Sequence, residues 1–137
     1  NLRVEHLESL KKIVGTIGWP TIQQVGANAS HMAWSIVQHA DFDLKYQKLV
    51  LDVLKQANQG QIMISEIPFL TDRIILNEGK KQLYGTQYEV DKQGNIIPRP
   101  IKSLNDVDER RKEYGLIPFN EYLASLKKAF VKKKEEM

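Results

Sequence analysis

The sequence predicts an α+β domain that is predominantly helical, with about six helices packed around one β-hairpin. Apolar residues recur every three or four positions along most of the chain, which is the period of an amphipathic helix. The period changes to two between about residues 82 and 98, where alternating residues flank a turn sequence, and this pattern is typical of a hairpin. No low-complexity linker interrupts the 137 residues, so we expect one domain spanning residues 1–137.

Three helical patterns occupy the N-terminal half. Residues 2–16 form the first, which glycines and a proline then end. In residues 29–40 an apolar stripe faces one side while Trp34 and Gln38 face the other, so we expect this helix to lie centrally with both sides covered. Asp41 or Asp43 is expected to cap the third helix, which ends at Asn58-Gln59-Gly60.

Three further helices are predicted on either side of the hairpin. Ser65 is expected to cap the fourth, which ends near Asn77. Ser103 or Asn105 opens the fifth, and Gly115 closes it. The last helix carries an apolar stripe that we expect to be core, formed by Phe119, Tyr122, Leu123, Leu126 and Phe130.

The basic character of the chain belongs to its C-terminal end. The formal net charge is +3, and the lysine-rich segment 127–137 holds five lysines against two glutamates, so the remaining charges balance. Lysines suit the negative end of a helix dipole and solvate a terminus. No aromatic residues interleave with them as a base-stacking platform, so we expect no nucleic-acid partner.

Several classes of protein and site are disfavoured by what the chain lacks. There are no cysteines, which excludes disulfides and thiolate metal sites. No spacing typical of a metal site or a phosphate-binding loop occurs, so we expect neither a metal nor a cofactor. No apolar run approaches the roughly 18 residues of a membrane span, and we expect a soluble protein, either cytoplasmic or exported after cleavage of a segment that precedes Asn1.

Residues 82–87 are the strongest candidate for a working surface. Read as a strand, they place Gln82, Tyr84 and Thr86 on one face and put Gln87 on the other with Leu83 and Gly85, so neither face is apolar. A purely structural strand would bury one apolar face. We therefore expect these four polar residues to position a substrate.

His39 is the candidate general acid or base. Its neighbours Asp41 and Asp43 are carboxylates that would fix its tautomer. The alternative is that His39 caps the C-terminus of its own helix.

Asp72, Arg73 and Arg111 complete the candidate site. Asp72 is expected to be the partner carboxylate of His39. Arg111 falls where helical patterning would place an apolar residue, and an arginine that is buried, at position 73 or 111, needs a partner. Each either forms a structural ion pair or binds an anionic ligand.

Five ordered motifs make the chain resemble an uncharacterised bacterial domain family of unknown function. They are Gly18-Trp19-Pro20-Thr21, Gln38-His39-Ala40-Asp41, Leu70-Thr71-Asp72-Arg73, Gln82-Leu83-Tyr84-Gly85-Thr86-Gln87, and Arg110-Arg111 with Gly115-Leu116. The resemblance spans about Leu10 to Leu126 and implies a shared polar constellation built from these motifs. It also implies that a further helix precedes Asn1, and it implies no reaction.

Two functions follow from this pattern. The first is a hydrolase-like enzyme with His39 and Asp72 as catalytic residues, acting on a small polar or anionic molecule, a peptide or a glycan. The second is a non-catalytic module that binds a ligand or a protein, in which the same residues form a structural network. The two are distinguished by whether the polar groups satisfy one another or face an open cleft.

Overall fold

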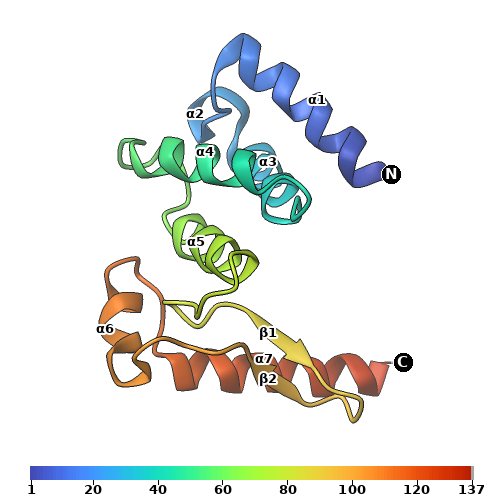
Figure 1. Cartoon of the computed structure of the whole chain (residues 1–137), viewed down its shortest axis with the longest axis vertical. Coiled ribbons are helices and arrows are strands. Elements are labelled where there is room, and N and C mark those ends of the chain that lie inside the picture. The colour runs from blue at the N-terminus through green and yellow to red at the C-terminus, as the bar shows by residue number, and fades with distance from the viewer. Residues whose placement is uncertain (137) are drawn as a thin grey trace.

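The computed structural model describes residues 1–136, which form seven α-helices, one 3-10 helix and one two-stranded antiparallel sheet (Figure 1). In chain order these are α1 (Leu2–Ile17), α2 (Ile22–Val25), α3 (Ala27–Gln38), α4 (Leu44–Lys55), α5 (Glu66–Asn77), β1 (Tyr88–Val90), β2 (Ile96–Pro98), η1 (Leu104–Asp106), α6 (Val107–Lys112) and α7 (Phe119–Glu136). The predominantly helical α+β fold with one hairpin is confirmed. The four-residue helix α2, which a Thr21 capping box begins, was not expected from the sequence.

The helices α1 to α5 enclose the hydrophobic core. Leu7, Val37, Leu54 and Leu70, from four different helices, are almost completely buried there. Helix α3 contacts α1, α4 and α5, and its buried residues, among them Ala33, Trp34, Val37 and Gln38, all lie on one face. The prediction of a helix covered on both sides is wrong, because Met32, which was expected in the core stripe, is 66% exposed on the opposite face.

The hairpin and α7 form a second layer, on the other side of α5 from α1 (Figure 1). Strand β1 pairs with β2 so that Tyr88 lies opposite Pro98 and Val90 opposite Ile96. Asp91 closes the turn by accepting hydrogen bonds from the backbone N–H groups of Gln93 and Asn95.

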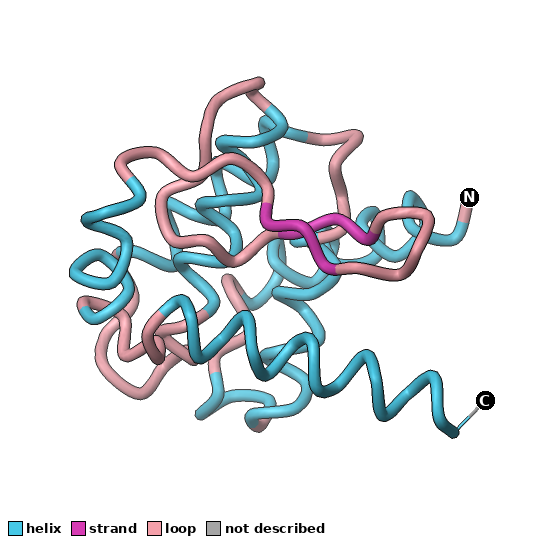
Figure 2. The backbone as a smooth tube through the Cα atoms, turned by 90° about the horizontal axis from the view of Figure 1, so that it is seen from below, coloured by secondary structure: helices cyan, strands magenta, loops and turns pink. Residues whose placement is uncertain are grey.

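The strand expected over residues 82–90 is shorter than predicted. The antiparallel pairing with β2 begins at Tyr88, and residues 82–87 belong to the connection between α5 and β1, which is coloured as loop in Figure 2. Gly85 in this loop has φ of +67°, a conformation that no strand residue adopts. The alternation in residues 82–87 therefore belongs to a loop whose polar groups form hydrogen bonds with neighbouring elements, and not to a strand.

Some of the expected helix ends also differ. Asp43 caps α4 through the backbone N–H of Tyr46, as predicted, but the Ser65 side chain makes no cap bond to α5. Neither expected cap residue of the fifth helix bonds to it: Ser103, with φ of +48°, precedes η1, and this turn leads into α6.

The stripe of the last helix is not core. No residue of α7 is fully buried, because the helix packs on one side only, against the hairpin and the preceding loop. Phe130 meets Tyr88 edge-on with ring centroids 6.3 Å apart. Within residues 1–136, no helix is both long enough and apolar enough to cross a membrane.

Candidate functional site

Asp72 lies at the centre of the polar constellation. Its side chain projects from α5 and is 0% exposed. One carboxylate oxygen accepts hydrogen bonds from the backbone N–H groups of Leu83 and Tyr84, at 2.8 and 3.0 Å. The other accepts from the N–H and the hydroxyl of Thr86, at 3.0 and 2.7 Å. We call residues 82–87 the Asp72 loop, because this carboxylate holds them in place.

Two opposing effects act on the pKa of the Asp72 carboxyl group. Burial raises the pKa of its carboxyl group, while the four donors of the loop favour the ionised form and oppose that rise. All four hydrogen bonds come from the loop itself, so the carboxylate presents no free face to solvent.

Gln82 closes the Asp72 loop with its side chain. The amide nitrogen donates to the carbonyl oxygens of Gln87 and Arg99, both at 2.9 Å, and the amide oxygen accepts from the N–H of Gln87 at 3.0 Å. The backbone of Gln82 pairs with that of Ile101 in an isolated parallel bridge. Gln82 is fully buried, so its amide is a structural element of the loop.

Gly85 allows the loop to approach α7 closely. A Cβ atom at this position would lie 2.8 Å from a ring carbon of Phe119. The neighbouring Tyr122 donates its hydroxyl to the carbonyl oxygen of Thr86 at 3.1 Å, and burial raises the pKa of Tyr122 to about 12, so the hydroxyl stays a donor. Helix α7 is thus fixed to the same loop as Asp72.

Two arginines cover the Asp72 loop from α6. Arg111 is 1% exposed and donates to the carbonyl oxygens of Ile117 and Tyr84, at 2.7 and 2.6 Å. Its guanidinium lies over the ring of Tyr122 at 4.8 Å, and within residues 1–136 no carboxylate forms an ion pair with it. Burial lowers the pKa of Arg111 accordingly. Arg110 donates to the carbonyl oxygens of Leu83 and Lys102.

Arg73 forms a structural ion pair with Asp41. Its Nε and Nη2 atoms donate to the two carboxylate oxygens of Asp41, at 2.9 and 2.6 Å, in a bidentate geometry. Asn77 donates to the same carboxylate at 2.8 Å, and Arg73 also donates to the side-chain oxygen of Gln87 at 3.3 Å. This ion pair connects the turn after α3 to α5 and to the Asp72 loop.

The Asp41 ion pair makes stability depend on pH. Arg73 lowers the pKa of Asp41 to about 2, from an ordinary value of 3.8. A carboxyl group whose pKa is lowered by folding stabilises the fold above its unfolded pKa, and that stabilisation is lost as the pH falls through the folded pKa. Because the Asp41 side chain is 40% exposed, we expect solvent screening to limit the effect to about 1 kcal/mol.

The measurement is urea unfolding of the wild type and of Asp41→Asn between pH 7 and pH 2. We expect the wild type to be more stable by about 1 kcal/mol at pH 7, and the difference to shrink towards pH 2. Asp52→Asn is the control, since this exposed residue of α4 makes no ion pair or side-chain hydrogen bond within residues 1–136. A difference that stayed constant over the whole pH range would show that the ionised carboxylate of Asp41 contributes nothing.

Within residues 1–136, no hydrogen bond joins His39 to Asp72 or to the Asp72 loop. His39 follows α3, is exposed, and its Nδ1 atom bonds to the carbonyl oxygen of Ser35 in its own helix at 2.9 Å. This is the helix-capping alternative described above. Neither expected carboxylate orients the ring, because Asp41 pairs with Arg73, and Asp43 bonds to Lys11 at 2.7 Å.

The other expected site residues do come together, as parts of one network. Asp72, Gln82, Thr86 and Arg111 are buried in it, and Arg73, Tyr84 and Gln87 are half-buried at its edge. Tyr84 contributes its backbone N–H and carbonyl groups, while its ring packs edge-on against Tyr114. The polar groups of the motifs therefore mostly satisfy one another.

A histidine–carboxylate pair elsewhere was not expected from the sequence. His31 Nδ1 lies 2.9 Å from the Oε2 atom of Glu66, whose side chain is almost completely buried, and the imidazole stacks on Trp34 at 5.0 Å. Burial raises the pKa of Glu66. The sequence placed His31 on the same side of α3 as Trp34 and Gln38. No feature near Glu66 in the sequence indicated that this glutamate would pair with His31.

An apolar hollow among the N-terminal helices was also not expected from the sequence. A groove of about 340 Å³ lies between α1, α2 and α3. Its ten lining residues include only two polar ones, and they are His6, Ser9, Leu10, Ile13, Pro20, Val25, Ala29, Met32, Ala33 and Ile36. We call this hollow the apolar groove. A second hollow, of about 250 Å³, is lined by Arg3, His6, Ser35, Ile36 and His39.

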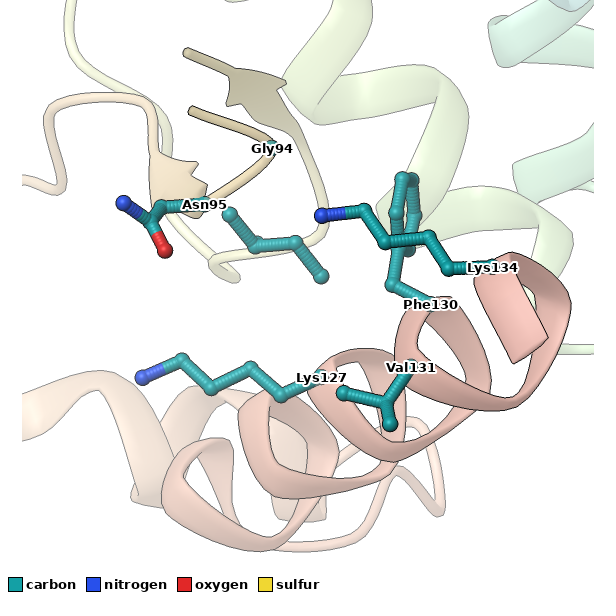
Figure 3. Close-up of a pocket in the computed structure, with 7 residues that line it drawn as sticks. Gly94, Asn95, Lys127, Phe130, Val131 and Lys134 are labelled. Atoms are coloured by element: carbon teal, nitrogen blue, oxygen red, sulfur yellow. The ribbon is translucent and has the colours of Figure 1, made fainter. Parts of the chain in front are cut away.

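A third hollow, of about 380 Å³, lies between the hairpin turn and α7 (Figure 3). Lys127 and Lys134 extend from α7 toward the hairpin, with Phe130 and Val131 on the same helix between them. Both ammonium groups belong to the lysine-rich end of the chain. Among the described residues, no three histidine, cysteine, aspartate or glutamate side chains lie close enough together to hold a metal ion.

The fold and this network define a small helical α+β domain in which a buried aspartate fixes a loop between a hairpin and the helices. The chain belongs to the family of unknown function DUF6624, whose model matches residues 2–135. The resemblance to an uncharacterised family is thereby confirmed. No curated protein and no solved structure matches the chain significantly.

Proposed function

We propose that this domain is a non-catalytic module that binds a small apolar ligand in the groove between α1, α2 and α3. One observation carries the proposal: large apolar side chains are left exposed around one hollow. Ile13, Val25 and Met32 are 48%, 38% and 66% exposed, and all three line the apolar groove. A contiguous patch of exposed apolar side chains is typical of a surface that binds a ligand or another protein.

The chemistry of the groove supports a small molecule. Small-molecule sites are mostly apolar, with few polar groups and volumes of roughly 300–1,000 Å³. The floor of the groove includes Leu10 and Ala33, which are buried in the core, so the shape of the site is fixed by packed helices. A preformed site loses little conformational entropy when a ligand binds.

The polar motifs support a structural role over hydrolysis. Hydrolysis by His39 and Asp72 would require both groups to face one substrate. The carboxylate of Asp72 is enclosed by its own loop, and His39 lines a different hollow with residues of α1 and α3. The alternative of a module with an internal polar network is therefore the better supported of the two functions.

Titration with the neutral dye Nile red tests the proposal. We expect saturable binding at one site, and a loss of affinity of about tenfold or more in Met32→Lys, because the substitution places a charge in the groove wall. Leu49→Lys is the matched control, since Leu49 is 51% exposed on α4 and lies outside the groove. Equal dye binding by Met32→Lys and the wild type, or no saturable binding, would overturn the proposal.

A further inference from the structure

The apolar groove opens at one end onto a hollow of different chemistry. The two hollows share the lining residues His6 and Ile36, so they are neighbours on the surface of α1 and α3. Beyond these shared residues the second hollow is lined by Arg3, Ser35 and His39, and no carboxylate lines either hollow. A ligand that fills the groove therefore meets basic and hydroxyl groups at this end.

Arg3 stands apart from the other arginines of the chain. Arg73 and Arg99 form ion pairs with Asp41 and Glu89, and Arg110 and Arg111 donate to backbone carbonyl groups. Within residues 1–136, Arg3 is the one arginine whose side chain has no such partner. Its guanidinium is permanently charged and carries donors that match the two oxygens of a carboxylate.

His39 adds a directed ring nitrogen to this hollow. Its Nδ1 atom is held by the carbonyl oxygen of Ser35 at 2.9 Å, which requires the N–H to lie on Nδ1. The Nε2 atom of the neutral ring is then an acceptor, so it suits a hydroxyl donor of a ligand, and the carboxylate contact is left to Arg3. His6 brings a second imidazole from α1, and Ser35 contributes a hydroxyl group.

We infer that the ligand of the groove is a single acyl chain that ends in a carboxylate, with the chain in the apolar groove and the carboxylate at Arg3. This inference rests on the proposed function and names its ligand class. Charge complementarity selects the anionic end, since the hollow holds a permanent positive charge and no negative one. The volume of about 340 Å³ is near the lower limit of small-molecule sites, which suits one unbranched chain.

The test compares three probes with the same ten-carbon chain, each used below its micelle concentration to displace Nile red. The probes are decanoate, decanol and decyltrimethylammonium. We expect decanoate to bind about tenfold tighter than either of the others. In Arg3→Gln we expect decanoate to weaken to the affinity of decanol, while decanol itself is unchanged. Arg99→Gln is the matched control, because Arg99 lies beside the hairpin and outside both hollows.

The outcomes separate this inference from the proposed function. If decanol binds as tightly as decanoate, or if Arg3→Gln leaves the preference for decanoate intact, the anionic end is wrong. The groove as a binding site still stands in that case, provided that Met32→Lys weakens dye binding by about tenfold or more. If neither the dye nor any ten-carbon probe binds saturably, the inference and the proposed function fail together.

Discussion

Replacing Asp72 with asparagine is expected to lower the free energy of unfolding by about 3 kcal/mol. The carboxylate accepts four hydrogen bonds, three of them from backbone N–H groups. An asparagine side chain accepts at one oxygen only, and its NH₂ group would face the remaining donors. Because the site is fully buried, water does not replace the lost bonds.

Urea unfolding at pH 7 measures this loss, with Asp52→Asn on α4 as the exposed control. Hydrogen exchange adds a local measurement, since the amides of Leu83, Tyr84 and Thr86 should lose protection in Asp72→Asn. A loss below about 1 kcal/mol with those amides still protected would contradict the structural role. It would instead indicate a carboxylate held ready for chemistry, as the hydrolase hypothesis requires.

The second large effect is expected for Arg111→Lys, which should lower the free energy of unfolding by about 3 kcal/mol. The guanidinium reaches two carbonyl oxygens, of Ile117 and Tyr84, and lies over the Tyr122 ring with its Cζ atom 4.8 Å from the ring centroid. A lysine ammonium is a point donor that cannot span both carbonyl groups or stack on the ring. One buried carbonyl would be left without a donor, while the positive charge stays buried.

The adjacent Arg110→Lys is the matched control for this substitution. Arg110 also donates to carbonyl oxygens, of Leu83 and Lys102, but it is half-exposed, so water can take the place of the lost bonds. We expect Arg110→Lys to cost about 1 kcal/mol. Equal losses for the two variants in urea unfolding would show that burial of Arg111 is not what makes it essential.

The helices were the predictable part of the fold. In α3 the apolar stripe indicated a helix correctly, because helical periodicity is a local property of the sequence, but it did not indicate which face of the helix neighbouring elements would cover. The Asp43 cap was predictable for the same reason. The apolar stripe of α7 gave the helix correctly but not its burial, since a stripe does not show how much of it a neighbouring layer covers.

The Asp72 loop was the part that periodicity described wrongly. The alternation of residues 82–87 resembled that of a strand, but the backbone N–H groups of Leu83, Tyr84 and Thr86 do not pair with a neighbouring strand. They donate to the carboxylate of Asp72, which lies eleven to fourteen residues earlier in the chain. Such side-chain to backbone bonds leave no periodic trace. Gly85 was the one local sign, since a glycine inside a strand often marks a break in pairing.

The candidate site was predicted unevenly for a related reason. The motifs singled out Asp72, Arg73 and Arg111 as polar residues of one constellation, and Arg111 in particular because its position contradicts helical patterning. Nothing in the sequence indicated that Asp41 would take Arg73 and leave His39 bound to its own helix. The apolar groove had no sequence signal at all, because its walls come from three helices whose apolar residues all look like core.

The side-chain amide of Gln82 has a consequence for which substitutions the loop tolerates. By donating twice and accepting once, this amide behaves as an extra peptide group inserted between the backbones of Gln87 and Arg99. Residues of nearly the same size then fail for different reasons: glutamate would turn two donors into acceptors facing carbonyl oxygens. Leucine would leave the N–H of Gln87 and the carbonyl oxygen of Arg99 without these bonds, while the carbonyl oxygen of Gln87 would keep its bond from the N–H of Arg99. Position 82 is therefore constrained by which side-chain atoms donate and which accept, and not by side-chain volume or hydropathy. A backbone peptide group is constrained in the same way.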